Sequence, residues 1–97
     1  MKIQLLRTAF DDIVLAQEFY EQQQNGLGIY FQDAIFSDID ALVLYAGVHV
    51  QVFGFYRALS RTFPYAIYYK LDDETVVVWR VLDCRAKPSN LKRKLKD

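Results

Sequence analysis

Arginine and tyrosine side chains are concentrated in the C-terminal half of the chain, and their spacing suits the binding of anions. The set comprises Arg57, Arg61, Arg85, Tyr65, Tyr68 and Tyr69. A guanidinium group presents several N–H donors in one plane, so it binds a phosphate or a carboxylate through two hydrogen bonds at once. Two interpretations are open: the three arginines line an anion-binding groove, or they form structural ion pairs with Asp72, Glu74 and Asp83.

Charge is divided unevenly along the chain. The formal net charge is zero, but residues 1–56 carry seven acidic and two basic side chains, whereas residues 57–97 carry five acidic and ten basic ones. The basic residues of the tail are Lys87, Lys92, Arg93, Lys94 and Lys96. This run is either a solvated helix face or part of a contact with phosphate or with an acidic partner segment.

Other chemistries find little support in the sequence. The single histidine, His49, lies in an irregular stretch, where a surface or loop role is expected rather than catalysis. The single cysteine, Cys84, cannot form an internal disulfide and is expected to pack as a small hydrophobic residue. Because there is no cysteine pair, histidine cluster or glycine-rich loop, we expect neither a metal ion nor another cofactor.

The first half of the chain predicts a strand and two helices. Residues 2–7 suit a short strand, and Thr8 is expected to cap the first helix. The apolar stripe of that helix is Ala9, Ile13, Ala16 and Tyr20. A break at Asn25 and Gly26 follows. The stripe of the second helix is Phe31, Ile35, Ile39 and Leu42. Two helices joined by such a break predict an antiparallel helical hairpin.

The second half of the chain predicts strands. Residues 48–61 alternate in places, residues 63–70 suit a strand, and residues 75–82 are apolar enough for a central strand. Within that central strand, one face is expected to carry Val76, Val78, Arg80 and Leu82. Pro88 and the run LKRKLK then predict a short terminal helix or a frayed tail.

The predicted fold is α+β, with the order β-α-α-β-β-β in a single domain over residues 1–97. One helical hairpin covers only one face of a small, mainly antiparallel sheet. We therefore expect the opposite face to be open and to carry the surplus aromatic and arginine side chains.

Several motifs together resemble a known protein family. In chain order they are an A-x-x-D-(I/L)-x-x-A-x-x-(F/Y)-Y helix, an L-G-x-x-F segment, an arginine before R-x-F-P-Y-x-I-Y-Y, and a V-x-V-x-x-V-L-D-x-R-x-x-P ending. The matching residues are Ala9, Asp12, Ile13, Ala16, Phe19, Tyr20, Leu27, Gly28, Phe31, Arg57, Arg61, Phe63, Pro64, Tyr65, Ile67, Tyr68, Tyr69, Val76, Val78, Val81, Leu82, Asp83, Arg85 and Pro88. The pattern covers nearly the whole chain and resembles the ParE branch of the RelE/ParE toxins, often called plasmid-stabilisation proteins.

The resemblance implies the toxin of a type II toxin–antitoxin pair, a small cytoplasmic protein that a co-encoded antitoxin wraps and neutralises. It also implies one of two activities. The ParE branch is known for inhibiting DNA gyrase, whereas the RelE branch cleaves mRNA in the ribosomal A site. A third interpretation is a member without toxicity that only binds its antitoxin and co-represses the operon.

Two features favour the ParE branch. Cleaving relatives use clustered lysine and arginine with a tyrosine in the C-terminal segment, but here no tyrosine follows Tyr69, and Leu91 stands where that tyrosine is expected. Ribosome-binding relatives also tend to be strongly basic, whereas the net charge of this chain is zero. We therefore expect a binding inhibitor of DNA gyrase rather than an enzyme. If the chain is a nuclease, its expected catalytic residues are Arg57, Arg61 and Arg85.

The remaining expectations concern contacts and location. The residues expected to contact the target are Arg57, Arg61, Arg85, Lys87, Lys92 and Arg93. Those expected to contact the antitoxin are Phe36, Val43, Tyr68 and Trp79. The antitoxin would provide the only link to DNA. No run of 18 apolar residues is present, so we expect no membrane span and a cytoplasmic protein.

Overall fold

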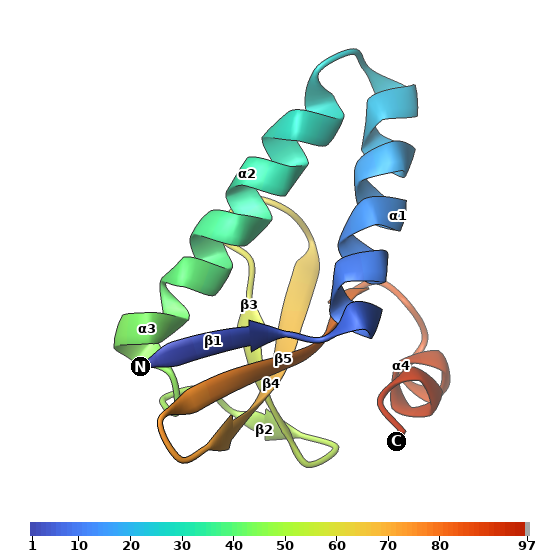
Figure 1. Cartoon of the computed structure of the whole chain (residues 1–97). Coiled ribbons are helices and arrows are strands. Elements are labelled where there is room, and N and C mark those ends of the chain that lie inside the picture. The colour runs from blue at the N-terminus through green and yellow to red at the C-terminus, as the bar shows by residue number, and fades with distance from the viewer. Residues whose placement is uncertain (97) are drawn as a thin grey trace.

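The computed structural model describes residues 1–96 and confirms the α+β class and the predicted order of elements (Figure 1). The elements are β1 (Lys2–Leu5), α1 (Arg7–Gln23), α2 (Leu27–Asp40), α3 (Leu42–Tyr45), β2 (Gln51–Val52), β3 (Phe55–Leu59), β4 (Tyr65–Asp72), β5 (Thr75–Asp83) and α4 (Pro88–Lys94). Two details differ from the prediction. Residues 48–61 contain two strands, and one turn of helix, α3, follows α2. None of the helices within the described residues is long and apolar enough to cross a membrane.

The strands within residues 1–96 form one sheet in the order β1-β5-β4-β3-β2. β1 runs parallel to β5, with Ile3 opposite Val76, and the other neighbouring strands are antiparallel. β4 and β5 are therefore inner strands, which agrees with their nearly continuous apolar sequences. The edges of the sheet are β1 and the two-residue strand β2.

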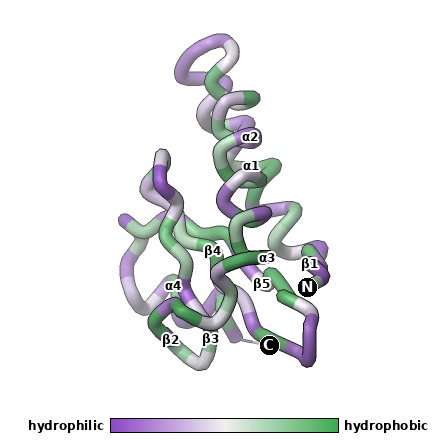
Figure 2. The backbone as a smooth tube through the Cα atoms, turned by 90° about the vertical axis from the view of Figure 1, so that its left-hand side faces the viewer, coloured by the Kyte–Doolittle hydropathy of each residue, from purple (hydrophilic) through white to green (hydrophobic). Residues whose placement is uncertain are grey.

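The hairpin of α1 and α2 rises over one face of the sheet (Figures 1 and 2). Its predicted stripes are buried against that face. The buried side chains of this core are Ala9, Ile13, Ala16, Phe31, Ile35, Ile39, Leu42, Ala58, Tyr65, Ile67, Tyr69, Val76, Val78 and Val81. Between the helices, the Glu21 carboxylate accepts the N–H groups of Gly26 (3.0 Å) and Gly28 (2.9 Å). These bonds satisfy amide groups at the start of α2 that have no partner within the helix.

The opposite face of the sheet is not fully open, because the end of α4 lies against it. Leu95 is 5% exposed and belongs to a second apolar cluster. The other members are Phe55, Ala66, Tyr68 and Leu82, with Trp79 and Leu91 packed alongside. The prediction of an open face is therefore wrong for the middle of the sheet. It holds toward the outer strand β3, where Leu59 is 59% exposed and strand alternation places it on the same face as Phe55.

A β-bulge in β5 changes which residues share a face. The β4–β5 register shifts between Tyr68 and Tyr69, which lie opposite Arg80 and Val78, so Trp79 is an extra residue. Beyond the bulge, Val81 rather than Arg80 continues the buried helix-facing side. The predicted face of Val76, Val78, Arg80 and Leu82 is therefore wrong.

α1 begins at Arg7, and no side chain caps it. Thr8, the predicted cap, instead donates a hydrogen bond from its hydroxyl to the carbonyl of Trp79 (2.8 Å). The Asp12 carboxylate accepts the N–H of Val81 at 3.0 Å. The first turns of α1 thus satisfy backbone groups along the part of β5 that β1 does not reach.

The hairpin between β2 and β3 has an unusual tip. Its two turn residues, Phe53 and Gly54, have φ values of 54° and 84°. Two positive φ values are typical of a type I′ turn, which favours sequences such as Asn-Gly. A bulky residue in this conformation is strained, yet the Phe53 side chain is 44% exposed.

Candidate functional site

A cleft at the end of β3 contains one arginine of the predicted set. Its volume is about 320 Å³. Its walls are Arg57, Leu59, Ser60, Phe63, Pro64, Tyr65 and Cys84. Strand alternation places the Arg57 side chain on the same face as Phe55, which is the face that α4 partly covers. The cleft therefore lies where this face is left uncovered.

The guanidinium group of Arg57 has unused hydrogen-bonding capacity. No carboxylate in the described part of the chain forms an ion pair with it, and its Nε atom is buried without a hydrogen-bond partner. Burial raises the pKa of Tyr68, and hydrogen bonding to Arg57 partly opposes this effect. Leaving a buried donor unpaired costs about 1–3 kcal/mol. An incoming phosphate or carboxylate would remove that cost and place a negative charge beside the guanidinium.

Arg85 is already paired with a neighbour. Its Nε and Nη2 atoms donate to the two carboxylate oxygens of Asp83 at 2.9 and 2.7 Å. This contact lowers the pKa of Asp83. The ion-pair interpretation of the sequence is therefore correct for Arg85, although 61% of its side chain remains exposed to a partner.

Cys84 lies close enough to Arg57 and Arg85 for both positive charges to affect its pKa. The residue is exposed, so the prediction that it packs as a small hydrophobic residue is wrong. Partial burial of its thiol raises its pKa, and the positive charges of Arg57 and Arg85 act in the opposite direction. Both arginines thus influence the same sulfur atom.

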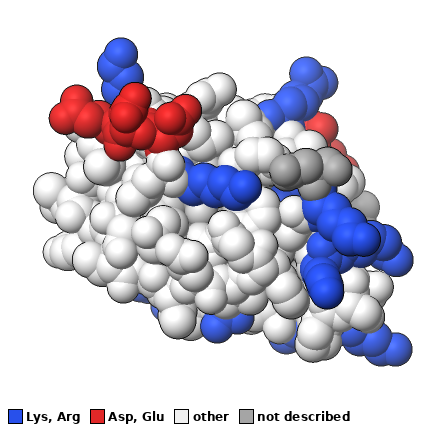
Figure 3. Space-filling model, turned by 90° about the horizontal axis from the view of Figure 1, so that it is seen from below, with Lys and Arg blue, Asp and Glu red and all other residues white. Residues whose placement is uncertain are grey.

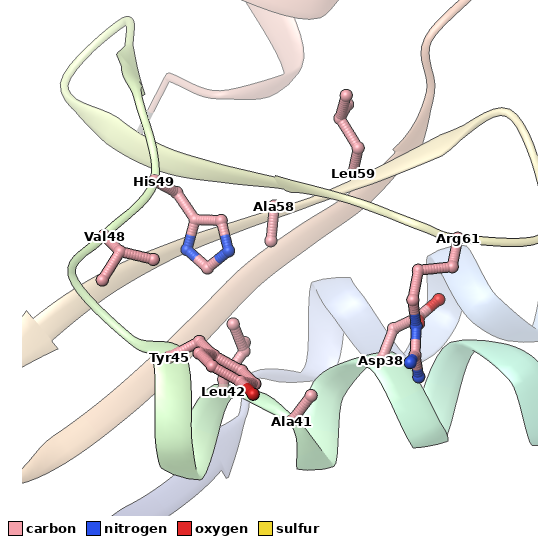
Figure 4. A pocket seen from close by; sticks show the side chains of 9 residues that line it. All are labelled: Asp38, Ala41, Leu42, Tyr45, Val48, His49, Ala58, Leu59 and Arg61. Atoms are coloured by element: carbon pink, nitrogen blue, oxygen red, sulfur yellow. The ribbon is translucent and has the colours of Figure 1, made fainter.

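Arg61 lies apart from the other two arginines. Its Nε donates to Oδ1 of Asp38 at 3.0 Å, and the other oxygen of Asp38 accepts the Ser60 hydroxyl at 2.7 Å. Figure 4 shows Arg61 and Asp38 together at one end of a separate pocket of about 230 Å³ between α2, α3 and β3. The prediction that the three arginines form one cluster is wrong, because residue 61 lies beyond β3, where the chain turns toward α2.

The partner of Arg61 was missed in the sequence, although a signal was present. Asp38 is 8% exposed and lies three residues after Ile35 and seven after Phe31. This spacing places its carboxylate on the apolar stripe of α2. Because buried carboxylates are paired with cations or hydrogen-bond donors, its position on the stripe indicates an ion pair with a distant residue.

The basic residues of the tail surround α4. Lys87 precedes the helix, Lys92 and Arg93 lie in its last turn, and all three side chains are exposed. Figure 3 shows most basic atoms of the lower face toward one end and an acidic group at the other end, with further basic side chains beside and between them.

The four residues predicted to contact an antitoxin differ in accessibility. Val43 is 44% exposed, whereas Phe36 is half-buried against the main core. Tyr68 is 1% exposed, so the prediction that it lies at the surface to contact an antitoxin is wrong. Trp79 is half-buried and packs against Phe55, with ring centroids 5.4 Å apart.

The similarity of this chain to known proteins is found in its structure. No family model matches the chain, and no curated protein matches it. Among solved structures, it aligns with a chain of the structure described as "Chromosomal ParDE TA system from P. aeruginosa". The TM-score is 0.72 at 15% sequence identity, over 84% of this chain and 92% of that chain.

The fold is similar to that of a ParDE chain. The likeness supports the ParE-like fold that the motifs predicted. At 15% identity the correspondence extends to the arrangement of helices and strands and not to individual side chains. Within residues 1–96, no group of three or more histidine, cysteine, aspartate or glutamate side chains is arranged to hold a metal ion.

Proposed function

We propose that this chain is the ParE-like toxin of a type II toxin–antitoxin pair and that a cognate antitoxin neutralises it. Two independent observations support the proposal. The first is the motif block from Arg57 to Pro88, and the second is the fold likeness to a chain of a ParDE system. The proposed target is DNA gyrase, as the resemblance to the ParE branch implies.

We further propose that the toxin acts by binding and not by cleaving RNA. The Arg57 cleft carries this part of the proposal. It offers the Arg57 guanidinium, whose Nε has no hydrogen-bond partner, but no side chain suited to transfer a proton at neutral pH. None of the residues that line the cleft is a histidine, lysine or carboxylate. Its tyrosine and thiol have raised pKa values: burial raises the pKa of Tyr65 to about 12 and also raises that of Cys84. General acid–base catalysis at neutral pH is most effective when the pKa is near the working pH, so these groups suit binding better.

The binding surface would extend from the cleft toward α4. Arg57 and Arg85 act on the same thiol, and Lys87 follows Arg85 by two residues. Lys92 and Arg93 extend the positive charge along α4. Such a surface fits an acidic region of a protein partner, with the half-buried Arg57 as the anchor and the exposed lysines speeding association.

Induced expression with matched arginine variants tests this proposal. We expect the wild-type chain to arrest growth and the purified protein to inhibit supercoiling by gyrase at micromolar concentrations. Arg57→Gln should abolish both effects, because it removes the unpaired cation. Arg61→Gln is the matched control, since Arg61 is 72% exposed and lies in the other pocket. It should keep both effects. Circular dichroism of each purified variant would establish that it is folded.

The other outcomes separate the alternative functions. Growth arrest with mRNA cleavage and unaffected supercoiling would identify a RelE-like endoribonuclease. Harmless expression, together with tight binding to the product of a neighbouring reading frame, would identify a chain that only binds its antitoxin. Equal loss of activity in Arg57→Gln and Arg61→Gln would contradict a specific role for the Arg57 cleft.

A further inference from the structure

One stretch of the chain is free of ionic side chains although much of it is exposed. Between Asp40 and Arg57 there is no aspartate, glutamate, lysine or arginine. In the chain as a whole, 25% of residues are charged. The backbone tube is largely green from α3 through β2, whereas the β4–β5 turn is purple (Figure 2). An exposed apolar surface of this kind marks an interaction site rather than a solvated surface.

Six exposed apolar side chains lie on α3, on the loop after it, on the β2–β3 hairpin and at the end of β3. They are Leu44 (78% exposed), Val48 (75%), Val50 (69%), Leu59 (59%), Tyr45 (57%) and Phe53 (44%). We refer to these six residues as the β2-edge patch. Tyr45 and Val48 come from α3 and the following loop, and they line the pocket beside His49 (Figure 4). Val50 pairs with Arg57 across the two strands, so its side chain lies on the same face of the sheet as Arg57, away from the helical hairpin. The patch therefore includes side chains from both sides of the sheet.

The loop that carries part of the patch is fixed to the sheet. The N–H of Gly47 donates to the Tyr69 hydroxyl at 2.9 Å, and that hydroxyl also contacts Nδ1 of His49. The rings of His49 and Tyr69 are perpendicular, with centroids 5.6 Å apart. These contacts fix the loop backbone on both sides of Val48 before any partner arrives, which lowers the entropy cost of binding.

Phe53 is the most informative member of the patch. Its φ of 54° places a bulky residue where asparagine or glycine is favoured, and the residue is still 44% exposed. Strained backbone of this kind is found at ligand-contacting and switch positions. The conformation thus presents an aromatic side chain at the tip of the β2–β3 hairpin, as a contact residue would require.

We propose that the β2-edge patch is the interface between two copies of this chain in solution. Its six side chains are 44% to 78% exposed, so together they present several hundred Å² of apolar surface. A stable protein interface covers roughly 800 Å² per partner, so the patch would form the apolar centre of such a contact. In a two-fold dimer the same patch faces itself, and a patch without ionic residues then brings no like charges together.

The charges around the patch also fit a two-fold arrangement. The β4–β5 turn, which contains Asp72, Asp73 and Glu74, and the basic helix α4 lie at opposite ends of the molecule (Figure 1). On the lower face, an acidic group lies at one end and most basic atoms lie toward the other, with one basic side chain in the otherwise uncharged surface between them (Figure 3). Two copies related by a two-fold axis across this middle region would bring the acidic end of each copy toward the basic end of the other. Such complementarity sets the orientation of the dimer and speeds its formation.

Sedimentation velocity of the full-length protein from about 1 to 200 µM tests the proposal. We expect a concentration-dependent dimer that dissociates in this range. Val50→Lys and Leu44→Lys each bury an unpaired charge in the apolar interface, so each should weaken the dimer at least tenfold. Ile29→Lys is the matched control, because Ile29 is 61% exposed at the start of α2, outside the patch. It should leave the dimer unchanged.

Phe53→Asn should stabilise the monomer but weaken the dimer. Asparagine suits the type I′ position, so the melting temperature of the monomer at low concentration should rise. The dimer should weaken at least tenfold, because the aromatic contact is lost. A wild-type chain that stays monomeric at about 200 µM would overturn the proposal, as would a dimer that tolerates all three patch variants. A patch that affects antitoxin binding and not self-association would also overturn it.

Discussion

Arg80 and Asp12 form a bidentate ion pair that joins the bulge of β5 to the first turns of α1. Nε and Nη2 of Arg80 each lie 2.7 Å from an oxygen of Asp12. The third nitrogen, Nη1, donates to the carbonyl of Lys94 at 2.9 Å. One guanidinium thus connects α1, β5 and the end of α4. It is possible because the bulge at Trp79 changes the direction of Arg80.

Removing this guanidinium should destabilise the fold. The two side chains are only 20% and 10% exposed, so Arg80→Met leaves a poorly solvated carboxylate at Asp12. We expect a loss of about 2 kcal/mol in the free energy of unfolding, below the roughly 3–5 kcal/mol of a fully buried pair, because the site keeps some contact with water. Urea denaturation of the variant and the wild type measures the difference.

The chain contains a control pair on the same helix. Arg7 and Asp11 lie 3.2 Å apart, but their side chains are 86% and 57% exposed. Arg7→Met should therefore cost less than about 0.5 kcal/mol. Equal losses in Arg80→Met and Arg7→Met would mean that the Arg80 contact does not stabilise the fold.

The sequence predicted the elements well because each has a periodic apolar pattern. The stripe of Phe31, Ile35, Ile39 and Leu42 is buried as expected, and so are all of residues 65–69. The bulge of β5 could not be predicted, since residues 75–82 are nearly all apolar and an extra residue there does not change the visible pattern. The cover provided by α4 was also missed, because only Leu91 and Leu95 of the basic tail are apolar.

The candidate site was predicted less well than the fold, because it depends on contacts between distant residues. Arg57 and Arg61 are four residues apart, and strand alternation alone would place them on one face. β3 ends at Leu59, however, and Arg61 then pairs with Asp38, which lies 23 residues earlier. Local periodicity carries no information about such a partner.

A close approach of the two long helices gives a second prediction. A Cβ atom added at Gly28 would lie 2.8 Å from the carbonyl oxygen of Gln17 and 3.0 Å from the Glu21 side chain. Gly28→Ala should therefore force α1 and α2 apart at their turn and cost about 2 kcal/mol, within the range for overpacking. Thermal unfolding followed by circular dichroism measures the loss.

Gly26→Ala separates this packing effect from a backbone effect. Gly26 has a φ of 87°, and a Cβ atom there would meet nothing within 4 Å. Its substitution should cost about 1 kcal/mol through backbone strain alone. A smaller loss for Gly28→Ala than for Gly26→Ala would show that the helices have room at Gly28.

A third prediction concerns the dependence of stability on pH. Burial lowers the pKa of His49 from its ordinary value of 6.5. The unfolded chain therefore takes up a proton at a higher pH than the folded chain does. The free energy of unfolding should fall as the pH falls through 6.5, and this loss should end once the pH is below the folded pKa. Denaturation at pH values from about 8 to 5 measures the effect.

His49→Gln should remove this pH-dependent part while keeping a polar group beside Tyr69. The lowered pKa of Asp83 contributes only in more acidic solution, because stability from a carboxylate is lost as the pH falls below its ordinary range. An unchanged slope between about pH 7 and pH 5.5 in His49→Gln would show that another group titrates there.

The contact between α4 and the sheet gives the last prediction. Leu95→Ala removes a side chain that is 5% exposed, so it should cost about 2 kcal/mol, at the lower end for a buried leucine. It should also wet the cluster that contains Trp79, the single tryptophan of the chain, and shift its fluorescence to longer wavelength. Leu15→Ala is the control, since Leu15 is 67% exposed and lies outside the β2-edge patch, so it should cost less than about 0.5 kcal/mol. If Leu95→Ala changes neither stability nor Trp79 emission, α4 does not cover the sheet, and the open face predicted from the sequence would be correct.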